Sequence, residues 1–88
     1  MEKESVIKKY KANPTVVEAA QLPGRRDGDY EEIRDWLGDG AIGSGNLVIV
    51  FTPEGAANAE PGDFIIKTAN EDLYVRRYSS FRAAYTEV

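Results

Sequence analysis

Apolar residues occur in short runs along this chain, and the first well-defined run covers residues 15–21. Its valines and alanines are typical of a β-strand. The Pro-Gly pair that follows favours a turn, so the strand is predicted to end there and to lead into a polar, basic loop over residues 23–28. Before the run, residues 6–12 are expected to be extended or loosely held, and residues 1–5 to be frayed.

The clearest helical pattern lies between about Tyr30 and Leu37. Its apolar stripe has the spacing i, i+3 and i+4 and consists of Ile33, Trp36 and Leu37. Asp29 is the expected N-cap, and Glu32 stands where a capping box requires an acidic residue. Gly38 is the expected residue after the helix because glycine tolerates a left-handed backbone.

Residues 47–52 read Leu-Val-Ile-Val-Phe-Thr, with apolar side chains on both faces. This pattern predicts a strand that is covered on both sides, by the helix on one and by a partner chain or a loop on the other. We expect the helical stripe to pack on Leu47, Ile49 and Phe51 or their neighbours. The flanking residues 38–46 and 53–62 are interpreted as a glycine-rich connection and a loop.

The C-terminal third is predicted to hold a β-hairpin, with strands over residues 64–68 and 72–78. A Pro-Gly-Asp turn leads into the first of these strands. Ser79 or Ser80 is expected to cap a short helical turn at residues 81–84, and residues 85–88 to add a last extended piece. The whole chain, residues 1–88, is therefore predicted to form one α+β domain, with a small, mainly antiparallel sheet, one packed helix and a short C-terminal helical turn.

The amino-acid composition limits the kinds of stabilising and catalytic sites that the chain can form. A chain of 88 residues buries a thin core, and such domains often gain stability from a metal, disulfides or a partner. The sequence has no cysteine and no histidine, which excludes disulfides and removes the usual ligands of transition metals. It also excludes the Ser-His-Asp and Cys-His catalytic arrangements. We therefore expect no enzyme activity, no catalytic residue, no metal and no cofactor, and we expect a homo-oligomer.

The formal net charge is −4, from 11 basic and 15 acidic residues. Such a balance argues against binding to duplex nucleic acid. No apolar run is long enough for a signal peptide or a membrane span, which predicts a cytoplasmic protein without a membrane partner.

Three local motifs have simpler interpretations than the sites they resemble. Residues 38–43 match Gly-x-Gly-x-x-Gly, but a helix precedes them and a strand follows, the reverse of a dinucleotide-binding loop. The alternating acids from Asp27 to Glu31 resemble the start of a calcium loop without its later glycine and glutamate, and first-turn acids explain them better. The basic residues near one end are interpreted as solvated surface: Lys8, Lys9, Lys11, Arg25 and Arg26.

The best candidate site lies on the last predicted strand, where Tyr74, Arg76 and Tyr78 share one face. Tyrosine rings can stack on a base, and arginine can pair with a phosphate or a carboxylate. Lys67 and Arg82 are possible neighbours from the adjoining strand and the final turn. The alternative is a purely structural face, in which the arginine lies between cross-strand aromatic rings.

Four stretches of the chain resemble a widespread family of small phage and prophage proteins with a Pro-Gly-Asp-aromatic-Ile-Ile signature (PGDYG-like). They are Lys-Ala-Asn-Pro-Thr-Val-Val-Glu-Ala-Ala-Gln at 11–21, the helix end at 36–40, Ala-Glu-Pro-Gly-Asp-Phe-Ile-Ile-Lys at 59–67 and Phe-Arg-Ala-Ala-Tyr at 81–85. The chain departs from the family pattern at several positions: Phe64 replaces tryptophan, Thr68 and Glu71 replace glycines, Val75 and Tyr78 replace prolines, and Ser79 replaces aspartate.

The resemblance implies a phage origin and action in the cytoplasm of a bacterial host, with no general activity established for the family. Three functions stay open. The chain could sequester a small anionic host ligand, such as a nucleotide second messenger, in a pocket shared between copies. It could instead mask a host protein, or serve as a structural or morphogenesis accessory. A sponge should bring basic and aromatic residues together in a concave site, whereas an inhibitor should show an exposed acidic or apolar patch.

Overall fold

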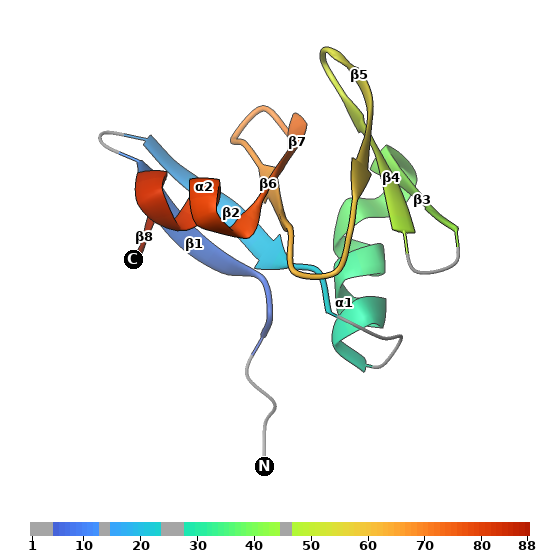
Figure 1. Ribbon diagram of the computed structural model, residues 1–88, viewed down its shortest axis with the longest axis horizontal. Helices are drawn as coiled ribbons and strands as arrows, with labels where there is room; N and C mark the ends of the chain where they lie inside the picture. Colours follow the sequence, from blue (N-terminus) through green and yellow to red (C-terminus); the bar gives the residue numbers. More distant parts are fainter. Residues whose placement is uncertain (1–4, 13–14, 24–27, 45–46) are drawn as a thin grey trace.

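The computed structural model describes residues 5–12, 15–23, 28–44 and 47–88. Within these ranges the chain forms eight strands, two α-helices and one 3-10 turn (Figure 1). In chain order they are β1 (Lys8–Ala12), β2 (Thr15–Gln21), α1 (Gly28–Leu37), η1 (Gly38–Gly40), β3 (Ala41–Ser44), β4 (Leu47–Thr52), β5 (Gly55–Ala59), β6 (Phe64–Lys67), β7 (Leu73–Arg76), α2 (Tyr78–Ala84) and β8 (Thr86–Glu87).

The strands form two antiparallel sheets. Sheet A has the order β7-β6-β2-β1-β8, and sheet B has the order β3-β4-β5. Figure 1 shows sheet A with α2 on one side of the molecule and sheet B with α1 on the other. This arrangement confirms the predicted α+β class with its packed helix and its C-terminal helical segment. The division of the strands into two sheets was not predicted.

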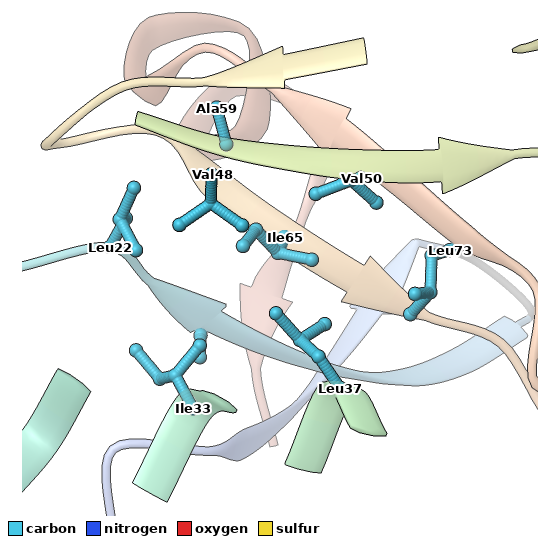
Figure 2. Close-up of a cluster of buried hydrophobic side chains, with 9 residues drawn as sticks. Leu22, Ile33, Leu37, Val48, Val50, Ala59, Ile65 and Leu73 are labelled. Atoms are coloured by element: carbon cyan, nitrogen blue, oxygen red, sulfur yellow. The ribbon is translucent and has the colours of Figure 1, made fainter. Parts of the chain in front are cut away.

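The first core lies where α1, sheet B and one face of sheet A meet (Figure 2). Its buried members are Ala20, Leu22, Ile33, Leu37, Val48, Val50, Ala59, Ile65 and Leu73. Ile33 and Leu37 therefore pack near Val48 and Val50, the neighbours of the residues predicted to receive them. Trp36 is only half-buried at the margin of this core. Burying each large aliphatic side chain stabilises the fold by roughly 1.5–3 kcal/mol.

The second core lies on the opposite face of sheet A, where α2 covers the strands. Its buried members are Tyr10, Val17, Ala19, Phe64, Ile66 and Phe81. The two faces separate because neighbouring residues in a strand point in opposite directions. Phe81 of α2 stacks on Phe64, with ring centroids 3.9 Å apart, and on Tyr85, at 4.7 Å. Tyr10 packs against Phe81 in an edge-to-face arrangement, with ring centroids 4.8 Å apart. This aromatic core attaches α2 to the sheet.

Two segments predicted to be irregular contain strands. Residues 38–46 hold η1 and β3, and residues 53–62 hold β5. The sequence of β5 is Gly-Ala-Ala-Asn-Ala, a composition with low intrinsic strand propensity. Hydrogen-bonded pairing with the strongly β-forming β4 supplies the structure that the local sequence does not encode.

The helix boundaries also differ from the prediction. Helix α1 begins at Gly28, two residues before the expected start, which places Asp29 inside the helix. The side chain of Asp29 lies outside the described residues, as do residues 24–27 of the predicted basic loop, with Arg25 and Arg26. The Glu32 carboxylate, expected in a capping box, accepts a hydrogen bond from the Ser5 hydroxyl. Gly38 follows the helix with a φ of +57°, as predicted.

The last strand is shorter than expected. β7 ends at Arg76 and α2 begins at Tyr78, so the predicted strand over residues 72–78 is wrong in its final part. The N-cap of α2 is Arg77, with no side-chain hydrogen bond, and neither Ser79 nor Ser80 fills that position. Glu71 adopts a φ of +65° in the turn between β6 and β7. This is the left-handed backbone conformation that favours glycine.

Candidate functional site

The structure separates the predicted site residues between the two faces of sheet A. Leu73 is buried in the first core and Val75 packs against it, as the alternation predicted. Tyr74 packs against the aromatic core on the α2 side, and Arg76 follows it on the same face with an exposed side chain. Tyr78 belongs to α2 rather than to β7, so the three residues do not form a continuous strand ladder.

Lys67 lies on the other face of the sheet and is engaged in the fold. Its Nζ donates a 2.6 Å hydrogen bond to the carbonyl oxygen of Trp36 and lies 5.3 Å from the centre of the indole ring. The Trp36 Nε1 in turn donates a 3.1 Å hydrogen bond to Oε1 of Glu18, the direct cross-strand partner of Lys67. The structure therefore does not bring Lys67 together with Arg76. Arg82, the other possible neighbour, is exposed on α2.

An open depression of about 610 Å³ lies at one end of sheet A. It is bounded by β1, the end of β2, the turn before β6 and the first residue of β6. We call it the β1–β6 depression. Its lining residues are Ser5, Val6, Lys8, Tyr10, Gln21, Leu22, Pro23, Pro61, Gly62 and Phe64. Lys8 is the one charged residue among them, and its Nζ lies 3.8 Å from the Glu87 carboxylate on β8.

Backbone hydrogen bonds fix the floor of the β1–β6 depression. The amide of Leu22 donates to the carbonyl oxygen of Asp63 at 2.8 Å, and the amide of Gly62 donates back to Leu22 at 2.9 Å. The Gln21 side-chain amide donates to the carbonyl oxygen of Gly62 at 3.1 Å. The buried Asp63 carboxylate accepts a 3.0 Å hydrogen bond from the amide of Glu60, which closes the turn. The Pro-Gly-Asp turn is thus held rigidly against the end of β2.

The Tyr10 hydroxyl is the most informative polar group in the depression. Tyr10 is only 7% exposed, yet its hydroxyl makes no hydrogen bond with any residue in the described ranges. Burial, with a smaller contribution from the nearby Glu87 carboxylate, raises the pKa of Tyr10 above its ordinary value of 10.0. The hydroxyl is therefore neutral at physiological pH. A buried hydroxyl with no partner among the described residues is suited to donate to a ligand or a bound water.

Lys8 supplies the positive charge beside Tyr10. Its Nζ lies 3.8 Å from Oε2 of Glu87 on β8, and both side chains are partly exposed. A contact of this length between partly exposed groups contributes little stability. Replacing this one contact by a contact with an anionic ligand would therefore cost little stability.

Two of the predicted residues flank this depression. In the sheet register, Gln21 of β2 pairs with Phe64 of β6, and Phe64 pairs with Arg76 of β7. The Tyr78 ring lies 6.1 Å from the Phe64 ring and is 53% exposed. Arg76 therefore lies one strand away from the lining residue Phe64. Tyr78 lies near the same residue but belongs to α2.

Sequence reasoning did not find the β1–β6 depression itself. Lys8 was grouped with surface lysines, and Tyr10 lay in a segment expected to be extended or loosely held. One signal was available, because Gln21 ends the first stretch of family likeness and Pro61, Gly62 and Phe64 belong to the signature stretch. The pairing of β2 with β6 brings the two stretches together.

A second depression of about 400 Å³ lies across the β2–β6 pair, beside the turn that follows β6. Its lining mixes Lys9 and Lys67 with Glu18 and Glu71, so neither sign of charge dominates. Lys67 is also held by Trp36. This depression is a weaker candidate for an anion.

No protein-family model, no curated protein and no solved structure matches this chain. In the part of the chain that the structure describes, neither helix is long and apolar enough to cross a membrane. The function is therefore argued from the geometry of the site.

Proposed function

We propose that this protein is a non-enzymatic, phage-type binding protein that acts in the cytoplasm of a bacterial host and sequesters a small anionic ligand, such as a nucleotide second messenger, in counter-defence. The observation that carries the proposal is the β1–β6 depression, where one cation and an unpartnered hydroxyl lie beside two aromatic side chains. Basic and aromatic residues gathered in a concave site are the combination expected of a ligand sponge.

Each part of the depression suits one part of such a ligand. Lys8 would pair with a phosphate, and the Tyr10 hydroxyl would donate to a phosphate oxygen or a base acceptor. The edges of the Tyr10 and Phe64 rings offer an apolar border for a flat group. A volume of about 610 Å³ lies within the usual range for small-molecule sites.

Arg76 and Tyr78 extend the proposed site toward α2. A larger ligand, such as a dinucleotide, would cross Phe64 and reach the Arg76 guanidinium with a second phosphate. This retains Arg76 and Tyr78 from the sequence-based hypothesis and gives Tyr74 a structural role beneath them. The absence of histidine and cysteine from the sequence supports binding without turnover.

A thermal-shift screen of cyclic and linear nucleotides, followed by calorimetric titration of any hit, tests the proposal. At about 100 times the dissociation constant a ligand should stabilise the fold by about 2.7 kcal/mol. Lys8→Met and Tyr10→Phe should each weaken binding about tenfold or more, because each removes a hydrogen-bond donor to the ligand. Lys9→Met, which changes an exposed lysine on the same strand, should bind as the wild type does.

Recovery of the unmodified nucleotide after denaturation would support sequestration rather than hydrolysis. Should no nucleotide raise the melting temperature, the sponge proposal would be wrong and the masking of a host protein would become the better hypothesis.

A further inference from the structure

The outer face of sheet B is an exposed apolar surface. β4 was predicted to be apolar on both sides, and its inner residues Val48 and Val50 are buried in the first core. On the other side, Phe51 is 46% exposed, and Ile42 of β3 is 55% exposed. Contiguous exposed apolar surface, unlike single exposed hydrophobic residues, marks interaction sites on many proteins. Among the described residues, the helix and the core cover only the inner side of β4.

The strand register shows how this surface is shaped. Ile42 pairs with Ile49, and Phe51 pairs with Ala56 on β5. Asn58 pairs with Ile49 on the same side of β4 as Ala56. The surface therefore has a bulky half over β3 and β4 and a low half over β5. We call these five residues the sheet B face.

The sheet B face is also uncharged. None of its five residues is ionisable, although the chain carries 26 charged residues, as the sum of 11 basic and 15 acidic ones, and has a net charge of −4. A surface that meets its own copy must avoid placing like charges together, because each group of one protomer approaches the same patch of the other. An uncharged face can meet its own copy without placing like charges together, so no oppositely charged partner is needed.

We propose that the sheet B face binds the sheet B face of a second copy of this chain around a two-fold axis. The bulky half of one protomer, with Phe51, then lies over the low half of the other, with Ala56. Sheets that pack face to face in this way interdigitate their side chains at a separation of about 10 Å. The shape of the face and its lack of charge both fit a second copy.

The size of the face sets the strength of the association. Three strands spaced about 4.8 Å apart, with up to six residues rising about 3.4 Å each, span roughly 300 Å² per protomer. A standard stable interface buries about 800 Å² per partner. The dimer is therefore weak, with a dissociation constant in the range of roughly 10 µM to 1 mM.

This inference is independent of the proposed function. The β1–β6 depression is lined by β1, β2, the β5–β6 turn and β6, and no residue of the sheet B face lines it. Dimerisation through sheet B therefore leaves the β1–β6 depression of each protomer open. Loss of ligand binding and loss of dimerisation are thus separate results.

Sedimentation velocity over about 5 to 1,000 µM protein tests the inference, because this range brackets the expected dissociation constant. The weight-average mass should rise from the 9.7 kDa monomer toward twice that value. Phe51→Lys should raise the dissociation constant about 100-fold or more, since the substitution enters a two-fold interface twice. Val16→Lys is the matched control, because Val16 on β2 has the same 46% exposure but lies on sheet A.

Ala56→Arg provides a second variant if Phe51→Lys fails to fold, and circular dichroism identifies that case. Ala56→Arg fills the low half of the face and should also give a monomer. A wild-type chain that stays monomeric throughout the range would overturn the inference. So would a dimer that both sheet B variants leave intact, or one that Val16→Lys abolishes.

Discussion

The Lys67 ammonium caps the end of α1 by donating a hydrogen bond to the Trp36 carbonyl oxygen 2.6 Å away, while lying 5.3 Å from the centre of the same residue's indole. The last carbonyl groups of an α-helix have no partner within the helix. A cation at this position also interacts favourably with the helix dipole. The indole continues the connection to sheet A through its hydrogen bond with Glu18. One lysine therefore joins α1 to β6 in two ways.

Replacing this lysine should lower stability rather than ligand affinity. Lys67→Met keeps much of the alkyl chain but removes the hydrogen bond and the cation–π contact, and we expect a loss of about 1–3 kcal/mol. Urea denaturation monitored by Trp36 fluorescence measures the change. Lys9→Met should cost less than about 0.5 kcal/mol, as surface substitutions usually do. If Lys67→Met matched this control, the contact would not support the fold.

Phe81 should be among the most sensitive positions in the chain. It is fully buried and lies between the rings of Phe64 and Tyr85. Phe81→Ala leaves a cavity and removes the stacking, with an expected cost of about 3–5 kcal/mol. Tyr78→Ala provides the comparison, because that half-exposed ring on the same helix should cost less than about 1 kcal/mol. Chemical denaturation distinguishes the two, and similar losses would contradict the packing of α2 described above.

The raised pKa of Tyr10 predicts a loss of stability at high pH. Burial disfavours the phenolate in the folded state, so the unfolded chain releases this proton at a lower pH than the folded chain does. The corresponding stability is present below the ordinary pKa of 10.0 and is lost as the pH rises through the folded-state value. Denaturation curves from neutral pH into the strongly alkaline range should therefore show a steeper decline for the wild type than for Tyr10→Phe. Parallel declines would show that Tyr10 does not titrate differently in the two states.

The sequence predicted those elements whose side-chain pattern was strong. The stripe of Ile33 and Leu37 and the alternation of Leu73 with Tyr74 correctly assigned faces, because burial on one side imposes a fixed period on a helix or a strand. β5 was missed because its small residues have no such period, and its structure depends on pairing with β4. The sequence predicted a core position for Trp36 and a place beside the candidate ligand site for Lys67. The structure instead joins the two residues at the end of α1.

The candidate site was harder to predict because its parts are distant in sequence. Lys8, Gln21 and Phe64 meet only through the register of three strands. Single positions in the sequence do not reveal that register. Arg76 lies on the same face of β7 as Tyr74, but Tyr78 starts a helix, and the ring stacking of Phe81 fixes where that helix lies. Tertiary contacts overrode the local strand pattern at this point.

The pairing of β1 with β8 has a consequence for how the protein is made. Tyr10, near the beginning of the chain, is the register partner of Glu87, near its end, and the aromatic core between them closes only when Phe81 is in place. Contacts between residues so far apart in sequence slow folding, since a long loop must close before they form. During synthesis, the face of β1 and β2 that carries Tyr10, Val17 and Ala19 therefore lacks its cover by Phe81 until α2 has been translated. The sheet that contains β1 is therefore complete only after β8 has been translated.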